Sequence, residues 1–323
     1  MILAKAPLRV SFFGGSSDIP AYYLKYTGAT ISMAIDKYVY VAVMHTPHKH
    51  IKISYSEQEL VTDVNDIKND IVRECLKYVG IKSNIEITTF ADMPTVGTGL
   101  GGSSAFTCAL LIALYAHIGQ SISSYELASL ACHIEIDLCK WNIGKQDQYA
   151  SAFGGMNHIT YGRYEKHDFF EDKIEDKVIV QKMNYFKLSN RMILVPTKGQ
   201  RHSSKIIDSI DFEEKKDLIH RLSVFATNLK YEVPEYYKYA EYLNKSWKIK
   251  EKLSKTISNK EIDLVYKKCM EANADACKLL GAGGGGYMLV MSRDINRIKE
   301  TFPERICLEF NLAEDGAKIV YRD

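Results

Sequence analysis

One short segment, PTVGTGLGGSSA at residues 94–105, is dominated by glycine and serine and leads directly into the apolar run FTCALLIALYAHI. Glycines let the backbone approach an anion closely and expose consecutive amides, and a helix that follows directs the positive end of its dipole at the same anion. Ser103 and Ser104 would lie on the first turn of that helix, where their hydroxyls can bind phosphate oxygens or a magnesium ion. The segment therefore predicts a phosphate-binding loop.

Two known phosphate-binding patterns come close to this loop without fitting it. Gly97 to Gly102 has the spacing of the dinucleotide pattern GxGxxG, as does Gly281 to Gly286. A dinucleotide loop must lead directly from a strand into a helix and then to a second strand. Here a stretch that includes Pro94 separates the strand from the loop, and the helix after the loop is followed by another helix. The Walker A pattern fails at Ser103, which stands where the lysine must be. A flexible linker is the remaining alternative, although ordering four glycines without a function has an entropy cost.

Three segments together resemble the GHMP kinase family, which includes galactokinase, homoserine kinase and mevalonate kinase. KAPLRVSFFGGSSD at 5–18 is similar to the first family motif, PTVGTGLGGSSA to the second, and KLLGAGGGGYMLV at 278–290 to the third. The resemblance covers nearly the whole chain and implies phosphoryl transfer from ATP with the help of Mg²⁺. It also implies the residues that bind the nucleotide, which are Gly97, Gly99, Leu100, Gly101, Gly102, Ser103, Ser104 and Ala105.

The resemblance also implies a magnesium site. Phosphoryl transfer needs a metal to neutralise the phosphates, a group that orients the acceptor hydroxyl, and positive charge where charge develops. Glu135, in ACHIEIDL, would join Ser104 in holding the ion, because carboxylate and hydroxyl oxygens suit a hard cation. Without the family, a solvated carboxylate on a helix face is the alternative for Glu135.

Asp147, in GKQDQYASAFGG, lies in a segment that resembles the one holding the catalytic aspartate of related sugar kinases. We expect it to orient the attacking hydroxyl and accept its proton. Arg9 matches the basic residue of the first motif that neighbours this aspartate, and its guanidinium would keep Asp147 ionised and stabilise the transferring phosphoryl group. A capping role near a turn is the alternative for Asp147.

Residues of the first motif are expected to bind the acceptor. Asp18 matches an acid that takes hydrogen bonds from ring hydroxyls, and Gly14 and Gly15 would let the backbone come close. The pattern is most similar to the branch of the family that phosphorylates an anomeric hydroxyl, with D-glycero-D-manno-heptose 7-phosphate as the expected substrate and fucose next. Ser16 and Ser17 depart from the Gly-Thr that is more usual there.

A sugar phosphate would require a second anion site, and PTKGQRHSSK at 196–205 offers basic and hydroxyl side chains. The segment resembles the TGxxR segment of the family, with the glycine displaced to Gly199, and predicts that Arg201 binds the substrate phosphate. A solvated basic turn is the alternative. Gly283 and Gly284 are expected to bring the backbone close to the nucleotide or the acceptor, or else to form a tight turn before the strand YMLVM.

The elements that must position these residues change along the chain. The first 60 residues have strand patterns in short pieces, which include separate strands at 29–35 and 37–45, and the segment 84–92 is another strand. Residues 67–79 have a helix pattern, and the helix after the apolar run is expected to begin at a capping box of Ser123 and Glu126. From 202 to about 280 the pattern is mostly helical. The sequence predicts an α+β fold with two domains: residues 1–185 would carry the nucleotide, magnesium and catalytic residues, and 186–323 would close the substrate cleft.

Bulk properties exclude several classes of protein. Lys plus Arg total 42 against 40 Asp plus Glu in 323 residues, so no global field attracts nucleic acid or an anionic membrane. No stretch approaches the ~20 apolar residues of a membrane span, the start lacks a signal-peptide pattern, and seven cysteines without a CxxC pair predict reduced thiols in the cytoplasm. The expected partner is a small sugar or sugar phosphate.

Two further alternatives concern function and the charged surface. A non-catalytic sensor for ATP and a sugar on the same scaffold remains open, because a fold does not guarantee catalysis. The lysine-rich run KSWKIKEKLSK at 245–255 is expected to be an exposed helix face with its charges in water.

Overall fold

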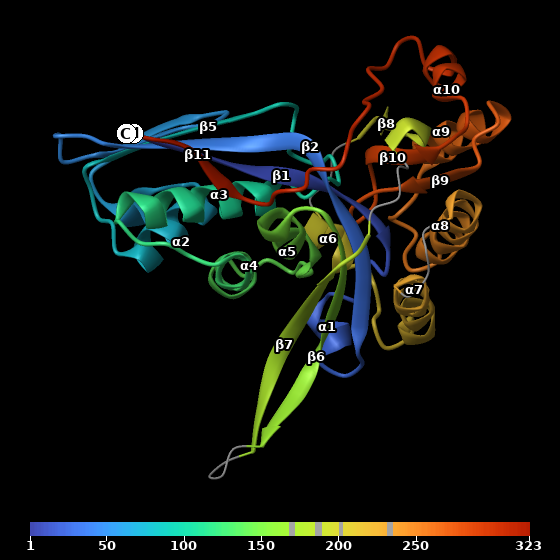
Figure 1. Ribbon diagram of the computed structural model, residues 1–323, viewed down its shortest axis with the longest axis horizontal. Coiled ribbons are helices and arrows are strands. Elements are labelled where there is room, and N and C mark those ends of the chain that lie inside the picture. Colours follow the sequence, from blue (N-terminus) through green and yellow to red (C-terminus); the bar gives the residue numbers. More distant parts are fainter. Residues whose placement is uncertain (168–171, 185–188, 200–202, 231–234) are drawn as a thin grey trace.

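The computed structural model describes residues 1–167, 172–184, 189–199, 203–230 and 235–323. Figure 1 shows a large sheet with helices packed along it, a second region of sheet and helices beside it, and a long hairpin, β6 and β7, that projects from the large sheet. This architecture confirms the predicted α+β class. Among the described residues, no helix is long and apolar enough to cross a membrane.

The large sheet has the strand order β11-β1-β2-β5-β3-β4, and the β6–β7 hairpin joins it through β2. Its pairings are antiparallel except for the parallel pair β3–β5. The sequence predicted separate strands at 29–35 and 37–45, but they form one strand that pairs with β6 in its first part and with β5 in its second. The strands are β1 (Ile2–Phe13), β2 (Gly28–His45), β3 (Ile51–Ser54), β4 (Gln58–Val61), β5 (Ile85–Ala91), β6 (Met156–His167), β7 (Asp172–Lys182) and β11 (Lys318–Arg322).

Helices pack on this sheet around one buried helix. α3 is apolar nearly all round, as its sequence predicted, and it contacts β1, β2, α2, α4 and α5. The predicted capping box is confirmed, since the Ser123 and Glu126 side chains each bond the other's backbone amide. The helices are α1 (Pro20–Tyr23), α2 (Asp70–Val79), α3 (Gly102–His117), α4 (Ser124–Cys132) and α5 (Gln146–Phe153), with a 3₁₀ turn at Val64–Asp66 and a π-helical turn at His133–Leu138.

The C-terminal region has its own antiparallel sheet, with the order β8-β10-β9, and its own core around Trp247 and Ile257. Leu229 and Tyr239 of this region pack instead into the core of the large sheet, and β11 returns to pair with β1. The boundary near 186 stays a prediction. The elements are the 3₁₀ turn Ser189–Arg191, β8 (Met192–Thr197), α6 (Ser203–Ile207), α7 (Lys216–Leu229), α8 (Tyr236–Lys250), α9 (Lys260–Glu271), β9 (Ala276–Leu279), β10 (Gly286–Met291) and α10 (Ile295–Thr301).

Candidate active site

Arg9 and Asp147, which are far apart in sequence, form a two-point ion pair beside the nucleotide loop, which is the glycine-rich segment 97–102. Arg9 of β1 donates from Nε to Oδ1 of Asp147 at 2.7 Å and from Nη2 to Oδ2 at 2.6 Å, while its Nη1 donates to the carbonyl of Gly99 at 2.6 Å. The Arg9 side chain is 5% exposed and that of Asp147 28% exposed, so the carboxylate keeps access to a ligand. Paired, parallel N–H···O bonds of this kind fix both position and orientation.

Asp147 lies in the first turn of α5, directly against the nucleotide loop. A Cβ added to Gly101 would lie 3.3 Å from Oδ2 of Asp147, so only a residue without a side chain leaves this approach unhindered. The hydrogen bonds of the Asp147 carboxylate in the described part of the chain go to Arg9, and the N-cap of α5 is Lys145. Capping therefore does not explain Asp147.

Glu135 lies in the π-helical turn that continues α4, and it is fully buried. Its carboxylate accepts hydrogen bonds from Ser104 Oγ at 2.8 Å, Thr107 Oγ1 at 2.8 Å and the side-chain amide of Gln148. Burial raises the pKa of Glu135 to about 7, against the opposing effect of these three donors. The alternative of a solvated carboxylate on a helix face is wrong. Short π-helical turns are frequent at functional sites.

The donor set around Glu135 suits magnesium. Ser104 at the start of α3 and Glu135 place a hydroxyl and a carboxylate oxygen side by side, and both are hard oxygen ligands. The described residues contain no group of three or more His, Cys, Asp or Glu side chains that could hold a metal. A magnesium ion here would therefore take its other ligands from phosphate oxygens and water, as is usual for this ion.

The nucleotide loop has the backbone that its glycines allow. Gly97, Gly99 and Gly101 have φ angles of 70°, 74° and 76°, in the left-handed region that favours glycine. α3 begins at Gly102, where an added Cβ would lie 2.6 Å from the Thr95 carbonyl. The predicted nucleotide residues of this segment differ in exposure: Leu100, Gly101, Gly102, Ser104 and Ala105 are buried, Gly97 and Gly99 are half-buried, and Ser103 is exposed at the start of α3.

The nucleotide loop is the first of two glycine clusters, and the second cluster, residues 281–286, packs backbone to backbone against it. A Cβ on Gly281 would lie 2.5 Å from the Cα of Gly99, and the amide of Tyr287 donates to the Thr98 carbonyl at 3.0 Å. Gly283 has a φ of 131°, and a Cβ there would lie 2.8 Å from the Cα of Ile257. The amide of Gly284 donates to the carbonyl of Ile257. The two glycine clusters that the sequence separates by about 180 residues therefore meet at one site.

Asp18 lies next to Gln146, the residue before Asp147, and is almost fully buried. Its Oδ2 accepts the backbone amide of Gln146 at 3.2 Å, and a Cβ on Gly144 would lie 1.9 Å from the same atom. Burial chiefly, and then the charge of Asp147, raises the pKa of Asp18 to about 6. Sequence reasoning did not single out Gly144 or Gln146.

The two glycines expected beside the acceptor differ in their surroundings. A Cβ on Gly14 would lie 1.8 Å from the Ala29 carbonyl of β2, so this glycine is required by packing within the sheet. A Cβ on Gly15 would meet only the Ser11 hydroxyl, at 4.0 Å, so the backbone at Gly15 is open to a ligand.

The predicted anion segment can be followed only in part, because Arg201 lies outside the described residues. Its described start packs on the second glycine cluster: Thr197 Oγ1 donates to the Gly286 carbonyl at 2.9 Å, and a Cβ on Gly285 would lie 2.2 Å from the Gly199 carbonyl. Lys198 and Lys205 are exposed. The segment therefore begins beside the candidate active site.

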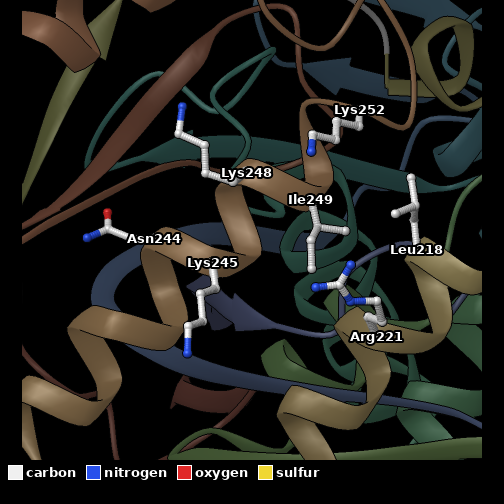
Figure 2. A pocket seen from close by; sticks show the side chains of 7 residues that line it. All are labelled: Leu218, Arg221, Asn244, Lys245, Lys248, Ile249 and Lys252. Carbon is white, nitrogen blue, oxygen red and sulfur yellow. The ribbon is translucent and has the colours of Figure 1, made fainter.

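The lysine-rich run at 245–255 is only partly an exposed face. Lys245, Lys248 and Lys252 are exposed and, with Arg221 of α7, line a cavity of about 310 Å³ between α7 and α8 (Figure 2). Lys250 is buried, so the prediction is wrong for this residue. At 100° per residue it falls on the same face as the buried Trp247. That apolar spacing is the signal that could have found it.

Comparison with known proteins agrees with this geometry. Residues 65–155 match the model of the GHMP kinases N terminal domain. The matched residues include the nucleotide loop, Glu135 and Asp147, and the catalytic class of the chain is that of an ATP-dependent kinase.

Individual relatives extend the likeness over the whole chain. A D-glycero-alpha-D-manno-heptose 7-phosphate kinase of Campylobacter jejuni is 27% identical over 98% of both chains. A bifunctional fucokinase/GDP-fucose pyrophosphorylase of Arabidopsis thaliana is 25% identical over 91% of this chain, which spans 30% of that protein. The crystal structure of a D-glycero-D-manno-heptose 1-phosphate kinase from Bacteriodes thetaiotaomicron has a TM-score of 0.78 and 22% identity over the full length of both chains, which shows the shared fold.

Proposed function

We propose that this chain, an ATP-dependent sugar kinase of the GHMP family, phosphorylates the anomeric hydroxyl of D-glycero-D-manno-heptose 7-phosphate to give the 1,7-bisphosphate. The observation that carries the proposal is the Arg9–Asp147 pair held against the nucleotide loop at Gly99 and Gly101. The full-length likeness to a heptose phosphate kinase supports the choice of sugar.

In the proposed reaction, Asp147 orients the anomeric hydroxyl and accepts its proton. The hydroxyl oxygen bonds to the γ-phosphorus of ATP, the bond from that phosphorus to the β-bridging oxygen breaks, and ADP leaves with the electron pair. Arg9 fixes the Asp147 carboxylate and supplies positive charge where charge develops on the transferring group. Arg9 also links the aspartate to the nucleotide loop through Gly99, so donor and acceptor sites share one anchor.

Ser104 and Glu135 would hold the magnesium ion. A bound magnesium ion would neutralise the charge of the phosphates and so favour transfer of the phosphoryl group. Thr107 and Gln148 keep the Glu135 carboxylate oriented, since each donates a hydrogen bond to it.

On the acceptor side, Asp18 and the open backbone at Gly15 would bind ring hydroxyls, and Arg201 would bind the phosphate at position 7. The start of the Arg201 segment lies against the second glycine cluster, which supports a phosphate site beside the sugar rather than a solvated turn. Gly283 and Gly284 hold that cluster in place. The name of the Campylobacter jejuni relative places the phosphate of its substrate at position 7.

The proposed compartment is the cytoplasm, which supplies ATP and keeps thiols reduced. All seven cysteines lie within the described ranges and are free.

The test is ADP release with magnesium and ATP across heptose 7-phosphate, the dephosphorylated heptose, mannose, galactose, fucose and homoserine. The proposal expects a strong preference for heptose 7-phosphate, lost in Arg201→Ala but kept in Lys205→Ala. If Arg201→Ala raised the KM for phosphorylated and unphosphorylated sugars equally, the phosphate site would be wrong. A preference for fucose or galactose would keep the kinase and replace its substrate, and silence on every acceptor would favour a sensor.

A further inference from the structure

Two lysine side chains of the C-terminal region are buried beside the candidate active site, and the proposed reaction uses neither. Lys250, at the end of α8, donates to the carbonyls of Leu279 at 3.0 Å and Gly281 at 2.5 Å. Lys278, on β9, donates to two carbonyls of β1, those of Ser11 at 3.1 Å and Phe12 at 2.5 Å. The two residues are 8% and 3% exposed.

Neither amino group has a carboxylate partner within the described residues, and burying such a group is unfavourable. An ammonium that is buried without a counter-charge loses its hydration and gains no compensating attraction. Burial lowers the pKa of Lys250 to about 7 and that of Lys278 well below its usual range, and Arg9 adds to both shifts. The charge of Lys250 also lowers the pKa of Lys278. Each lysine binds two backbone carbonyls and so fixes a specific piece of backbone.

Lys250 fixes the second glycine cluster at the point where it meets the nucleotide loop. It binds the carbonyl of Gly281, whose backbone lies on that of Gly99. The carbonyl of Gly99 in turn accepts Arg9 Nη1, and Arg9 holds Asp147. A shift of Gly281 would therefore reach the nucleotide loop first and the catalytic pair second.

Lys278 fixes the end of β1, on the acceptor side. The residue whose carbonyl it binds, Ser11, also donates from Oγ to the side chain of Gln146 at 3.0 Å. The backbone amide of Gln146 donates to the carboxylate of Asp18, and Gln146 directly precedes Asp147. A shift of β1 at Ser11 would therefore reach the acceptor residues first.

We propose that Lys250 and Lys278 are positioning residues for phosphoryl transfer, Lys250 for the nucleotide loop and Lys278 for the acceptor side. Lys278 ties the C-terminal region directly to β1, whereas Lys250 fixes Gly281, which packs on Gly99 of the nucleotide loop. The expected changes in kcat and KM rest on the proposed function, whereas the expected changes in hydrogen exchange do not.

The kinetic test compares Lys250→Met and Lys278→Met, which keep the apolar stem and remove the donor. We expect kcat to fall about 10- to 100-fold in both, because small misplacements of reacting groups have effects of this size. The KM for ATP should rise about tenfold in Lys250→Met with little change for the acceptor, and the reverse should hold in Lys278→Met. Lys248→Met, on the exposed face of α8 (Figure 2), is the matched control and should resemble the wild type.

Hydrogen exchange gives a readout that does not depend on the substrate. Amides of residues 97–101 should exchange faster in Lys250→Met, those of residues 11–18 faster in Lys278→Met, and neither set in Lys248→Met. If a methionine variant fails to fold, the Gln variant at that position takes its place with the same expectations. Equal changes of both KM values, or unchanged exchange in both loops, would overturn the inference. If the wild type releases no ADP with any acceptor, the proposed function fails, and the exchange data still decide the positioning roles.

Discussion

The regions around the two glycine clusters use charge in opposite ways. Around the first cluster, two carboxylates converge from separate elements: Asp147 pairs with Arg9, and Glu135 sits beneath three neutral donors. Around the second cluster, two of the described residues are buried lysines, and their amino groups bind backbone carbonyls. Acids and hydroxyls that can meet a metal or a substrate gather at one cluster, and donors that fix the backbone gather at the other.

This contrast separates chemistry from positioning within one site. A carboxylate that takes a proton must remain reachable, and Asp147 is 28% exposed, whereas Lys250 and Lys278 are nearly inaccessible. Substitutions of the two carboxylates should therefore change rate or metal dependence, and substitutions that add a side chain where the two clusters pack on each other should change the free energy of unfolding.

The largest expected effect is that of Asp147→Asn. The amide cannot accept the acceptor proton, so kcat should fall about 100- to 10,000-fold while ATP affinity stays nearly intact. Steady-state kinetics and calorimetric titration with a non-hydrolysable ATP analogue measure the two quantities. Near-normal turnover in this variant would remove Asp147 from the mechanism.

Glu135→Gln should have the next largest effect. The neutral amide keeps the shape of the side chain and loses the charge that would hold magnesium with Ser104. Activity at limiting magnesium should fall at least about 10- to 100-fold and recover in part as magnesium is raised. Thr107→Val is the control, because it removes one hydrogen bond and leaves the carboxylate. An unchanged magnesium dependence in Glu135→Gln would place the ion elsewhere.

Gly99→Ala tests the contact between the clusters. A Cβ at Gly99 would lie 2.6 Å from the Leu280 carbonyl, and the residue has a φ of 74°. We expect the free energy of unfolding to fall by about 3 kcal/mol, from the sum of overpacking and left-handed backbone strain. Gly119→Ala is the matched control, since φ is 75° and a Cβ meets nothing within 4 Å, and it should lose only about 1 kcal/mol. Equal losses in urea unfolding would mean that the cluster contact contributes nothing.

The smallest effect concerns Asp18 and pH. Its native pKa of about 6 lies above the ordinary value of 3.8, so between these values the native state keeps a proton that the unfolded state has released. The wild type should therefore lose stability relative to Asp18→Asn as pH rises from about 4 to 6, by at most about 3 kcal/mol, with no further change above that range. Urea unfolding at several pH values measures the difference, and a constant difference would contradict the burial of an ionisable Asp18.

Local patterns in the sequence predicted most of the elements and part of the site. Apolar spacing predicted α3 and β5, the capping box predicted the start of α4, and the motifs predicted that Arg9 would neighbour Asp147. The sequence could not predict that the two glycine clusters pack on each other, because that contact joins residues about 180 positions apart.

Two predictions from the sequence, for β2 and for Lys250, were wrong for a related reason. The sequence pattern divided β2 into two strands, because the partners that make it continuous lie on other parts of the chain. Lysines are expected at the surface, and only the helical position of Lys250 beside Trp247 indicates that it is buried. Gln148 and Thr107 went unnoticed because their partner, Glu135, is reached only through the tertiary fold.

Phosphorus NMR of a reaction with magnesium, ATP and heptose 7-phosphate shows directly whether the anomeric hydroxyl is phosphorylated. We predict that the ATP signals give way to ADP while one new sugar phosphate signal appears, split by coupling to the anomeric proton, beside the retained signal of the 7-phosphate. ADP with inorganic phosphate only, or a new ester coupled to any other ring position, would contradict the claim that Asp147 directs the anomeric hydroxyl to ATP.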